Sequence, residues 1–122
     1  MRILSIDDSR ATRQFIRCAV DVMGGELLEA AHGRDALALL EHENVDLILL
    51  DWNMPVMDGM QTLRALKANP ALQSIPVTMV TTETERHKVI EAISAGAKNY
   101  LMKPFSQEDL VGKVMESLGM GF

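Results

Sequence analysis

The sequence predicts an α/β protein built on a doubly wound parallel sheet of five strands with five helices. Short apolar runs alternate with longer stretches of helical periodicity along the whole chain. The run from Leu47 to Leu50 shows no polar alternation, which is typical of a strand that helices cover on both faces. Because strict alternation of strands and helices favours parallel strands joined by right-handed crossovers, we expect helices on both sides of the sheet.

Five strands are expected at the apolar runs. The third run is the most uniformly apolar, so it should occupy a central position in the sheet. In chain order, the predicted strands are Ile3–Ile6, Leu27–Ala30, Asp46–Leu50, Val77–Val80 and Asn99–Met102.

Five helices are expected between and after these strands, since apolar residues recur there at intervals of three and four. In the last helix, Ser106 and Asp109 form the pattern of a capping box, and Gly119 is suited to end the helix. In chain order, the predicted helices are Ser9–Met23, Gly33–Glu43, Gly59–Ala68, Glu83–Ala95 and Ser106–Leu118.

Composition indicates an ordinary soluble domain. The chain has 122 residues, of which 48% are hydrophobic and 24% charged, so one domain over residues 1–122 is expected. Its formal net charge of -5 and the lack of a basic cluster argue against direct nucleic-acid binding. No apolar run approaches the length of a membrane span, and Met1 leads straight into a strand pattern rather than a signal peptide. We therefore expect a cytoplasmic monomer that does not contact membranes.

The single cysteine and the single tryptophan are both expected to pack. Cys18 falls within an amphipathic segment that contains Phe15 and Ile16, so burial explains it better than redox chemistry. Trp52 follows Asp51 and should point to the opposite side of the chain from it, which also favours packing.

Polar side chains gather where the predicted strands end. In an open parallel sheet these ends share one edge, so three carboxylates would meet there and repel each other unless cations compensate. Oxygen ligands favour Mg²⁺ over Zn²⁺, because the sequence has no cluster of Cys or His. The histidines, His32, His42 and His87, are expected on solvated helix surfaces. The strand-end residues are Asp7 and Asp8, then Asp51, then Thr81 and Thr82, and last Lys103.

These groups are the parts of a phosphoryl-transfer site: a carboxylate nucleophile, a divalent cation, an ammonium group and a hydroxyl. Asp7 and Asp8 form a pair placed to hold metal, whereas Asp51 stands alone at the central strand. Asp51 is therefore the predicted nucleophile, and Lys103 and Thr81 are the predicted partners of the phosphoryl oxygens. The product would be an aspartyl phosphate.

The sequence resembles the response-regulator receiver family over its whole length. The resemblance rests on five short sequence blocks; each block alone is a weak signal, but five blocks in the right order at strand ends are a specific one. The resemblance implies a flavodoxin-like sheet with strand order 2-1-3-4-5 and a stand-alone switch. The matching blocks are Asp7-Asp8-Ser9, Asp51-Trp52-Asn53-Met54-Pro55, Met57-Asp58-Gly59, Thr81-Thr82 and Lys103-Pro104-Phe105.

The resemblance also implies a ligand set for Mg²⁺. In the family pattern, Asp8 and Asp51 coordinate the ion directly together with the backbone carbonyl of Asn53, while Asp7 acts through water. Asp51 would receive its phosphoryl group from a histidine kinase.

Further expectations come from the same resemblance. The bond between Lys103 and Pro104 would be cis. Tyr100 would be an aromatic switch that turns inward as Thr81 moves toward the phosphate, although simple packing at the end of a strand also accounts for it.

The sequence departs from the family at one position beside the site. Thr82 stands where Ala or Gly is common and could narrow the path to Asp51. Asn53 and Glu83 occupy the two variable positions that tune the attack of water on the acyl phosphate, and this pair resembles chemotaxis-type receivers.

The signal is expected to pass by protein contact through the fourth helix, the fifth strand and the fifth helix. Solvated charge explains the polar residues of this surface equally well. They are Arg86, Lys88, Tyr100 and Lys113.

Other functions fit less well. A phosphorelay shuttle between histidine proteins is the nearest alternative to a chemotaxis or motility switch. An aspartyl-phosphate phosphatase of the haloacid-dehalogenase type would need Asp where Asn53 stands, and a flavin-binding module would need a phosphate-binding loop where Asp7 and Asp8 repel phosphate. The expected outcome of phosphorylation is a changed conformation of the protein itself, so the protein is not expected to be an enzyme.

Overall fold

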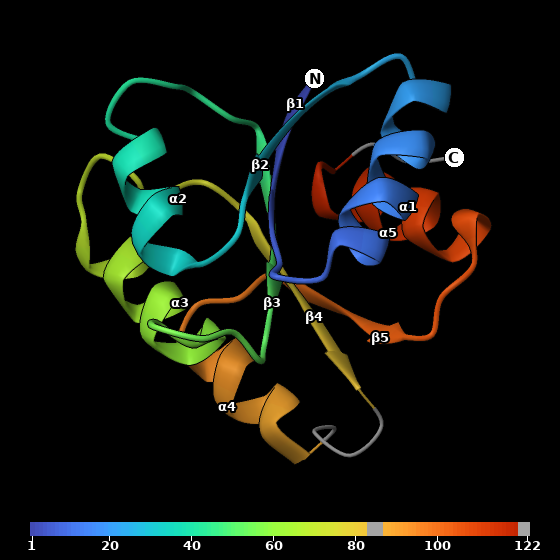
Figure 1. Ribbon diagram of the computed structural model, residues 1–122. Coiled ribbons are helices and arrows are strands. Elements are labelled where there is room, and N and C mark those ends of the chain that lie inside the picture. The colour runs from blue at the N-terminus through green and yellow to red at the C-terminus, as the bar shows by residue number, and fades with distance from the viewer. Residues whose placement is uncertain (83–86, 120–122) are drawn as a thin grey trace.

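A parallel sheet runs through the middle of the protein (Figure 1). The computed structural model describes residues 1–82 and 87–119, and within these ranges the sheet has the order β2-β1-β3-β4-β5 with every neighbouring pair parallel. The predicted class and strand order are thereby confirmed, with β3 at the centre. The strands are β1 (Arg2–Ile6), β2 (Glu26–Ala30), β3 (Leu47–Asp51), β4 (Val77–Thr82) and β5 (Asn99–Lys103).

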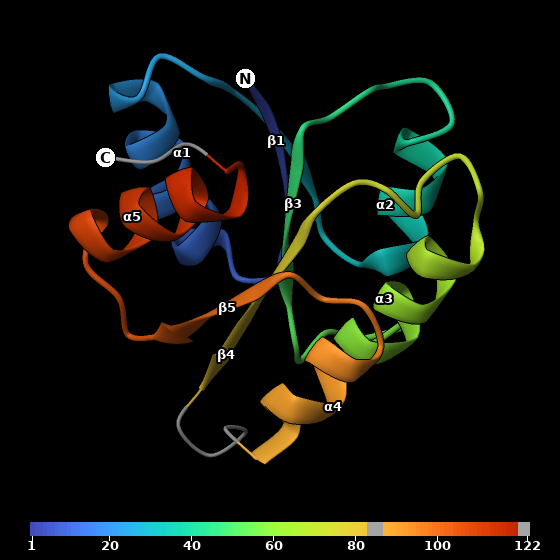
Figure 2. The same ribbon diagram turned by 180° about the vertical axis from the view of Figure 1, so that it is seen from behind.

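Helices cover both faces of the sheet. Figures 1 and 2 show α1 and α5 together on one side, and α2, α3 and α4 on the other. This arrangement follows from right-handed crossovers between parallel strands. The helices are α1 (Arg10–Val22), α2 (Gly33–Leu39), α3 (Gly59–Ala68), α4 (Val89–Ser94) and α5 (Gln107–Ser117).

The core consists of two apolar layers that β3 joins. Every residue of β3 is buried, as expected for a strand covered on both faces. Ile48 and Leu50 pack in the layer under α2 and α3, whereas Leu47 and Leu49 pack in the layer under α1 and α5. The sheet therefore holds the end of β3, where Asp51 lies, between two rigid layers.

Helix α5 has the predicted caps. The hydroxyl of Ser106 accepts the backbone N–H of Asp109 at 3.0 Å, and the Asp109 carboxylate accepts the N–H of Ser106. Gly119, with φ of 72°, follows the helix in the left-handed region that glycine favours. Both details confirm the sequence reading of the chain around Ser106 and Gly119.

Two predicted helices differ from those observed. α2 ends at Leu39 rather than Glu43, because Arg2 holds the carboxylate of Glu43 and the carbonyl of Asn44 against the start of β1. α4 begins at Val89, and the earlier part of the predicted helix includes residues 83–86, which lie outside the described ranges.

The expected burial of Cys18 is wrong. Ile16, Ala19 and Val20 form the buried face of α1, and Cys18 is exposed. The reason is geometric, since residues two apart on a helix point to nearly opposite sides.

The histidines partly follow the prediction. His42 and His87 are exposed. His32 instead caps α2, where its ring Nδ1 accepts the backbone N–H of Asp35 at 3.4 Å and the ring is partly buried. Across the described residues, no helix is long and apolar enough to cross a bilayer.

Candidate phosphorylation site

The strand-end residues of the prediction meet at the carboxyl edge of the sheet. Asp7 directly follows β1, Asp51 is the last residue of β3, and β1 and β3 are neighbours in the sheet. Both carboxylates are buried, with exposures of 2% for Asp7 and 7% for Asp51. Two buried acids side by side are costly, so their neighbours must supply positive charge.

Asp8 completes a group of three carboxylates. One carboxylate oxygen from each of Asp7, Asp8 and Asp51 lies within 4.8 Å of the other two, and Asp8 is exposed. Asp7 is further fixed by the backbone N–H of Ser9, which donates to its Oδ1 at 2.7 Å. The group thus has a buried floor and an open side facing solvent.

Lys103, the last residue of β5, bridges the two buried acids. Its Nζ donates at 3.3 Å to Asp7 Oδ2 and at 3.3 Å to Asp51 Oδ1. Burial lowers the pKa of Lys103, but the charges of Asp51 and Asp7 outweigh it and raise this pKa above its ordinary value. The ammonium group therefore stays charged at neutral pH.

Asp51 has an unusual affinity for a proton. Burial and the charge of Asp7 raise its pKa to about 6, although Lys103 acts in the opposite direction. At neutral pH most of the carboxyl is still ionised, as a nucleophile requires.

Two threonines, Thr81 and Thr82, are the last residues of β4, the strand that pairs with β3 beside Asp51. Thr81 is buried, and its hydroxyl donates to the carbonyl of Thr82 at 3.3 Å. Thr82 is partly buried and lines an apolar pocket together with Lys103 and Phe105. Its effect on the path to Asp51 stays a prediction. Glu83, the predicted site-tuning residue, lies outside the described residues.

Comparisons with known proteins identify this arrangement. The family model of the response regulator receiver domain matches residues 3–115. The chain belongs to this family. A chemotaxis protein CheY homolog of Campylobacter jejuni is 38% identical over 123 residues, which cover 99% of this chain and 95% of that protein. This receiver domain is accordingly a response regulator of the two-component type, and the likeness to CheY indicates chemotaxis.

Solved structures of receiver domains have the same fold. The chemotaxis response regulator CheY4 of Vibrio cholerae is 35% identical with a TM-score of 0.89, and the alignment covers 95% of this chain and 97% of that one. The receiver domain of the sensor histidine kinase PA1611 of Pseudomonas aeruginosa is 25% identical with a TM-score of 0.87 over 97% of each chain. That structure is described with a magnesium ion coordinated in the active site cleft.

The donor set in this receiver domain suits a hard divalent cation. Asp7, Asp8 and Asp51 bring three carboxylates together, and Lys103 is the ammonium group bonded to two of them. Oxygen donors with an open, solvated side match the preference of Mg²⁺ for carboxylates and water. Asn53 lies nearby on the exposed loop after β3, and the use of its carbonyl as a ligand stays a prediction.

The bond between Lys103 and Pro104 is cis, as the family resemblance implied. Trp52 is buried in the core layer under α2 and α3, which confirms its predicted packing role. The ammonium of Lys88 lies 5.4 Å from the centroid of the Trp52 ring, so this lysine packs against the site loop rather than standing free.

Tyr100, the predicted switch of the receiver domain, lies at the surface. It is 38% exposed on β5, and its ring lies beneath the ammonium of Lys113 at 5.0 Å. This is the outward position of the residue; its movement on phosphorylation stays a prediction.

Two residues shape the loop after Asp51 in ways that the sequence reading did not predict, although Gly59 belongs to the matching Met57-Asp58-Gly59 block. Gly59 begins α3 against the backbone of Asp51 and Trp52, and Val56 has a positive φ of 68°. The backbone N–H of Met57 donates to the carbonyl of Pro55 at 2.7 Å, which closes a tight γ-turn around Val56. A β-branched residue gives no sequence signal for such a turn, because it adopts positive φ with strain.

Replacing Val56 with glycine should therefore stabilise the protein. Val56 is exposed, so the change removes little buried surface while relieving the strain of its backbone conformation. We expect the free energy of unfolding in urea to rise by about 1 kcal/mol. Val22 is a matched control, because it is similarly exposed but lies in helix α1, where Val22→Gly should lower stability. A loss of stability in Val56→Gly would contradict the assignment of strain.

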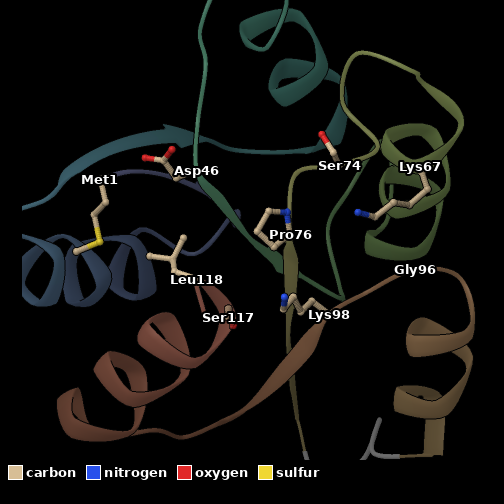
Figure 3. A pocket seen from close by; sticks show the side chains of 9 residues that line it. All are labelled: Met1, Asp46, Lys67, Ser74, Pro76, Gly96, Lys98, Ser117 and Leu118. Carbon is tan, nitrogen blue, oxygen red and sulfur yellow. The ribbon is translucent and has the colours of Figure 1, made fainter. Parts of the chain in front are cut away.

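A second pocket lies at the opposite end of the sheet (Figure 3). Two of its charged side chains are engaged, since Lys67 donates to the carbonyls of Gln73 and Ile75 and Asp46 accepts the backbone N–H of Arg2. The acidic cluster that Lys103 bridges lies at the other end of the sheet, at the carboxyl edge.

Proposed function

We propose that Asp51 accepts a phosphoryl group from a phosphohistidine of a histidine kinase, in the presence of Mg²⁺, and that the phosphorylated protein signals through protein contacts in chemotaxis or motility. The observation that carries this proposal is the bridge from Lys103 to Asp51 and Asp7, beside the exposed Asp8. A single acid at the end of a strand would not need such a bridging ammonium group.

In the proposed reaction, an oxygen of the Asp51 carboxylate attacks phosphorus, the bond from phosphorus to the histidine nitrogen breaks, and an acyl phosphate forms. Lys103 leaves its direct bond with Asp51 and donates to a phosphoryl oxygen, and Thr81 contributes its hydroxyl. Bound Mg²⁺ would neutralise phosphoryl charge, with Asp8, Asp51 and the Asn53 carbonyl as direct ligands and Asp7 acting through water.

The proposed output surface comprises α4, β5 and α5. Ile90 on α4 is 78% exposed and Tyr100 on β5 is 38% exposed, so the surface offers apolar side chains to a partner. Lys113 adds positive charge there, whereas Lys88 packs against Trp52 and Arg86 lies outside the described residues. Action as a single domain is also proposed, since the chain spans 95% of its Campylobacter relative.

The proposal is tested by incubation with Mg²⁺ and acetyl phosphate, followed by intact mass. The wild type should gain one phosphoryl group, and Asp51→Asn should gain none. Asp21→Asn serves as the control, because Asp21 is an exposed acid on α1 away from the site, and it should gain the group like the wild type. A phosphoryl group on Asp51→Asn would refute the assignment.

The pathway needs a separate experiment. Phosphorylated protein should retain flagellar switch proteins in a pull-down and leave histidine phosphotransfer proteins unbound. The reverse result would favour a phosphorelay shuttle.

A further inference from the structure

Tyr100 lies at the surface of β5 under the side chain of a lysine from the neighbouring helix α5. We propose that Lys113 holds Tyr100 in this outward position and so restrains the switch in the unphosphorylated protein. The inference rests on the switching role that the proposed function gives to Tyr100.

Lys113 contacts the Tyr100 ring directly and is linked to the Tyr100 backbone through Asn99. Its Nζ lies 5.0 Å from the centroid of the ring, within the range of a cation–π interaction. The same Nζ donates to Asn99 Oδ1 at 3.3 Å, and this oxygen also accepts the backbone N–H of Tyr100 at 2.9 Å. One ammonium group therefore engages both the Tyr100 ring and the Asn99 side chain that accepts the Tyr100 backbone N–H.

The lysine itself is anchored by the core. The carbonyl of Lys113 accepts the hydroxyl of Ser117 at 2.6 Å, and the Ser117 hydroxyl lies 2.7 Å from that of Thr78. Ser117 and Thr78 are buried, so α5 is fixed to β4 at this point. Lys113 thus reaches Tyr100 from a part of the fold that stays in place when a surface ring turns.

An inward turn of Tyr100 would break the contact of its ring with the ammonium. The contact exists in the outward state alone, so its whole interaction free energy favours that state in the equilibrium between outward and inward ring. For a partly exposed cation–π pair, this corresponds to about twofold to fivefold in the ratio of outward to inward ring. Loss of the charge should change the ratio by this factor toward the inward state.

The sequence offers a clean probe, because Tyr100 is its only tyrosine. Protein that carries 3-fluorotyrosine gives fluorine signals from this position alone, and the shift between H₂O and D₂O measures exposure of the ring. In the unphosphorylated protein, the ring of Lys113→Met should be less exposed than that of the wild type. Lys113→Arg should restore the wild-type value, since arginine keeps the charge over the ring.

Lys98→Met is the matched control, because Lys98 is an exposed lysine just before β5 with no contact to the Tyr100 ring among those described. It should leave the signal unchanged. A lysine that merely covers the ring predicts the opposite sign, namely greater exposure in Lys113→Met. Greater or unchanged exposure in that variant would overturn the inference.

The same samples separate this inference from the proposed function. Failure of the wild type to gain a phosphoryl group from acetyl phosphate would defeat the proposed function, whereas the exposure comparison needs no phosphorylation. If the wild type gains the group and Lys113→Met shows wild-type exposure, only the restraint by Lys113 fails.

Discussion

Replacing Gly59 with alanine is expected to lower the free energy of unfolding by about 3 kcal/mol, because the added methyl group has no room. A Cβ at Gly59 would lie 2.5 Å from the carbonyl oxygen of Asp51 and 2.8 Å from Cα of Trp52. Both atoms belong to the backbone, so no side-chain rotation relieves the clash. The start of α3 would have to move away from the end of β3.

The measurement is urea unfolding followed by the fluorescence of Trp52. Gly112→Ala in α5 provides the control, since a Cβ there meets nothing within 4 Å and alanine is the better helix former. It should be as stable as the wild type or more stable. If Gly59→Ala were as stable as the wild type, the start of α3 could move away from the end of β3 at no cost, and the prediction would be wrong. We also expect Gly59→Ala to take up less phosphoryl group, because the displaced backbone is that of Asp51.

The second large effect is a gain of stability in Asp51→Asn at neutral pH. The carboxyl of Asp51 has a pKa of about 6 in the folded protein against its ordinary value of 3.8. The folded state therefore binds the proton more tightly than the unfolded state, and the free energy of unfolding falls as pH rises from 3.8 to 6. This decrease in the free energy of unfolding is complete above pH 6, and it amounts to at most about 3 kcal/mol.

Urea unfolding of both proteins across this range checks the sign. At pH 3.5 the wild type and Asp51→Asn should be similarly stable, and at pH 7 without Mg²⁺ the variant should be more stable. Asp21→Asn, in which an exposed acid is changed, should follow the wild type at every pH. A wild type that becomes more stable relative to Asp51→Asn between pH 4 and 6 would contradict the raised pKa. Added Mg²⁺ should narrow the gap, because it binds the folded wild type.

The sequence was sufficient to predict the fold because its signals were local and consistent. The uniform run at Leu47–Leu50 placed the central strand, and the cap at Ser106 placed the last helix. Errors arose where a distant residue decides the outcome. Arg2, which lies 41 and 42 positions earlier in the chain, holds Glu43 and Asn44, and no pattern within the predicted second helix reveals this contact.

The site divides in the same way. Parallel strands place their ends at one edge, so the meeting of Asp7, Asp51 and Lys103 could be predicted from their positions alone. The distances between these groups and their burial could not be predicted from the sequence, and they are what raises the pKa of Asp51. The γ-turn at Val56 and the close approach of Gly59 to the backbone of Asp51 and Trp52 depend on how the loop packs, and the Met57-Asp58-Gly59 block alone does not reveal these contacts.

The bond between Lys103 and Asp7 joins residues 96 positions apart in the chain. Asp7 and Asp51 leave the ribosome long before Lys103, so a growing chain has its acids without the ammonium that bridges them. The complete set of charged groups at the carboxyl edge arises only when β5, the last strand, has been made and has joined β4. Truncated or half-finished copies therefore lack the full set of groups at this edge.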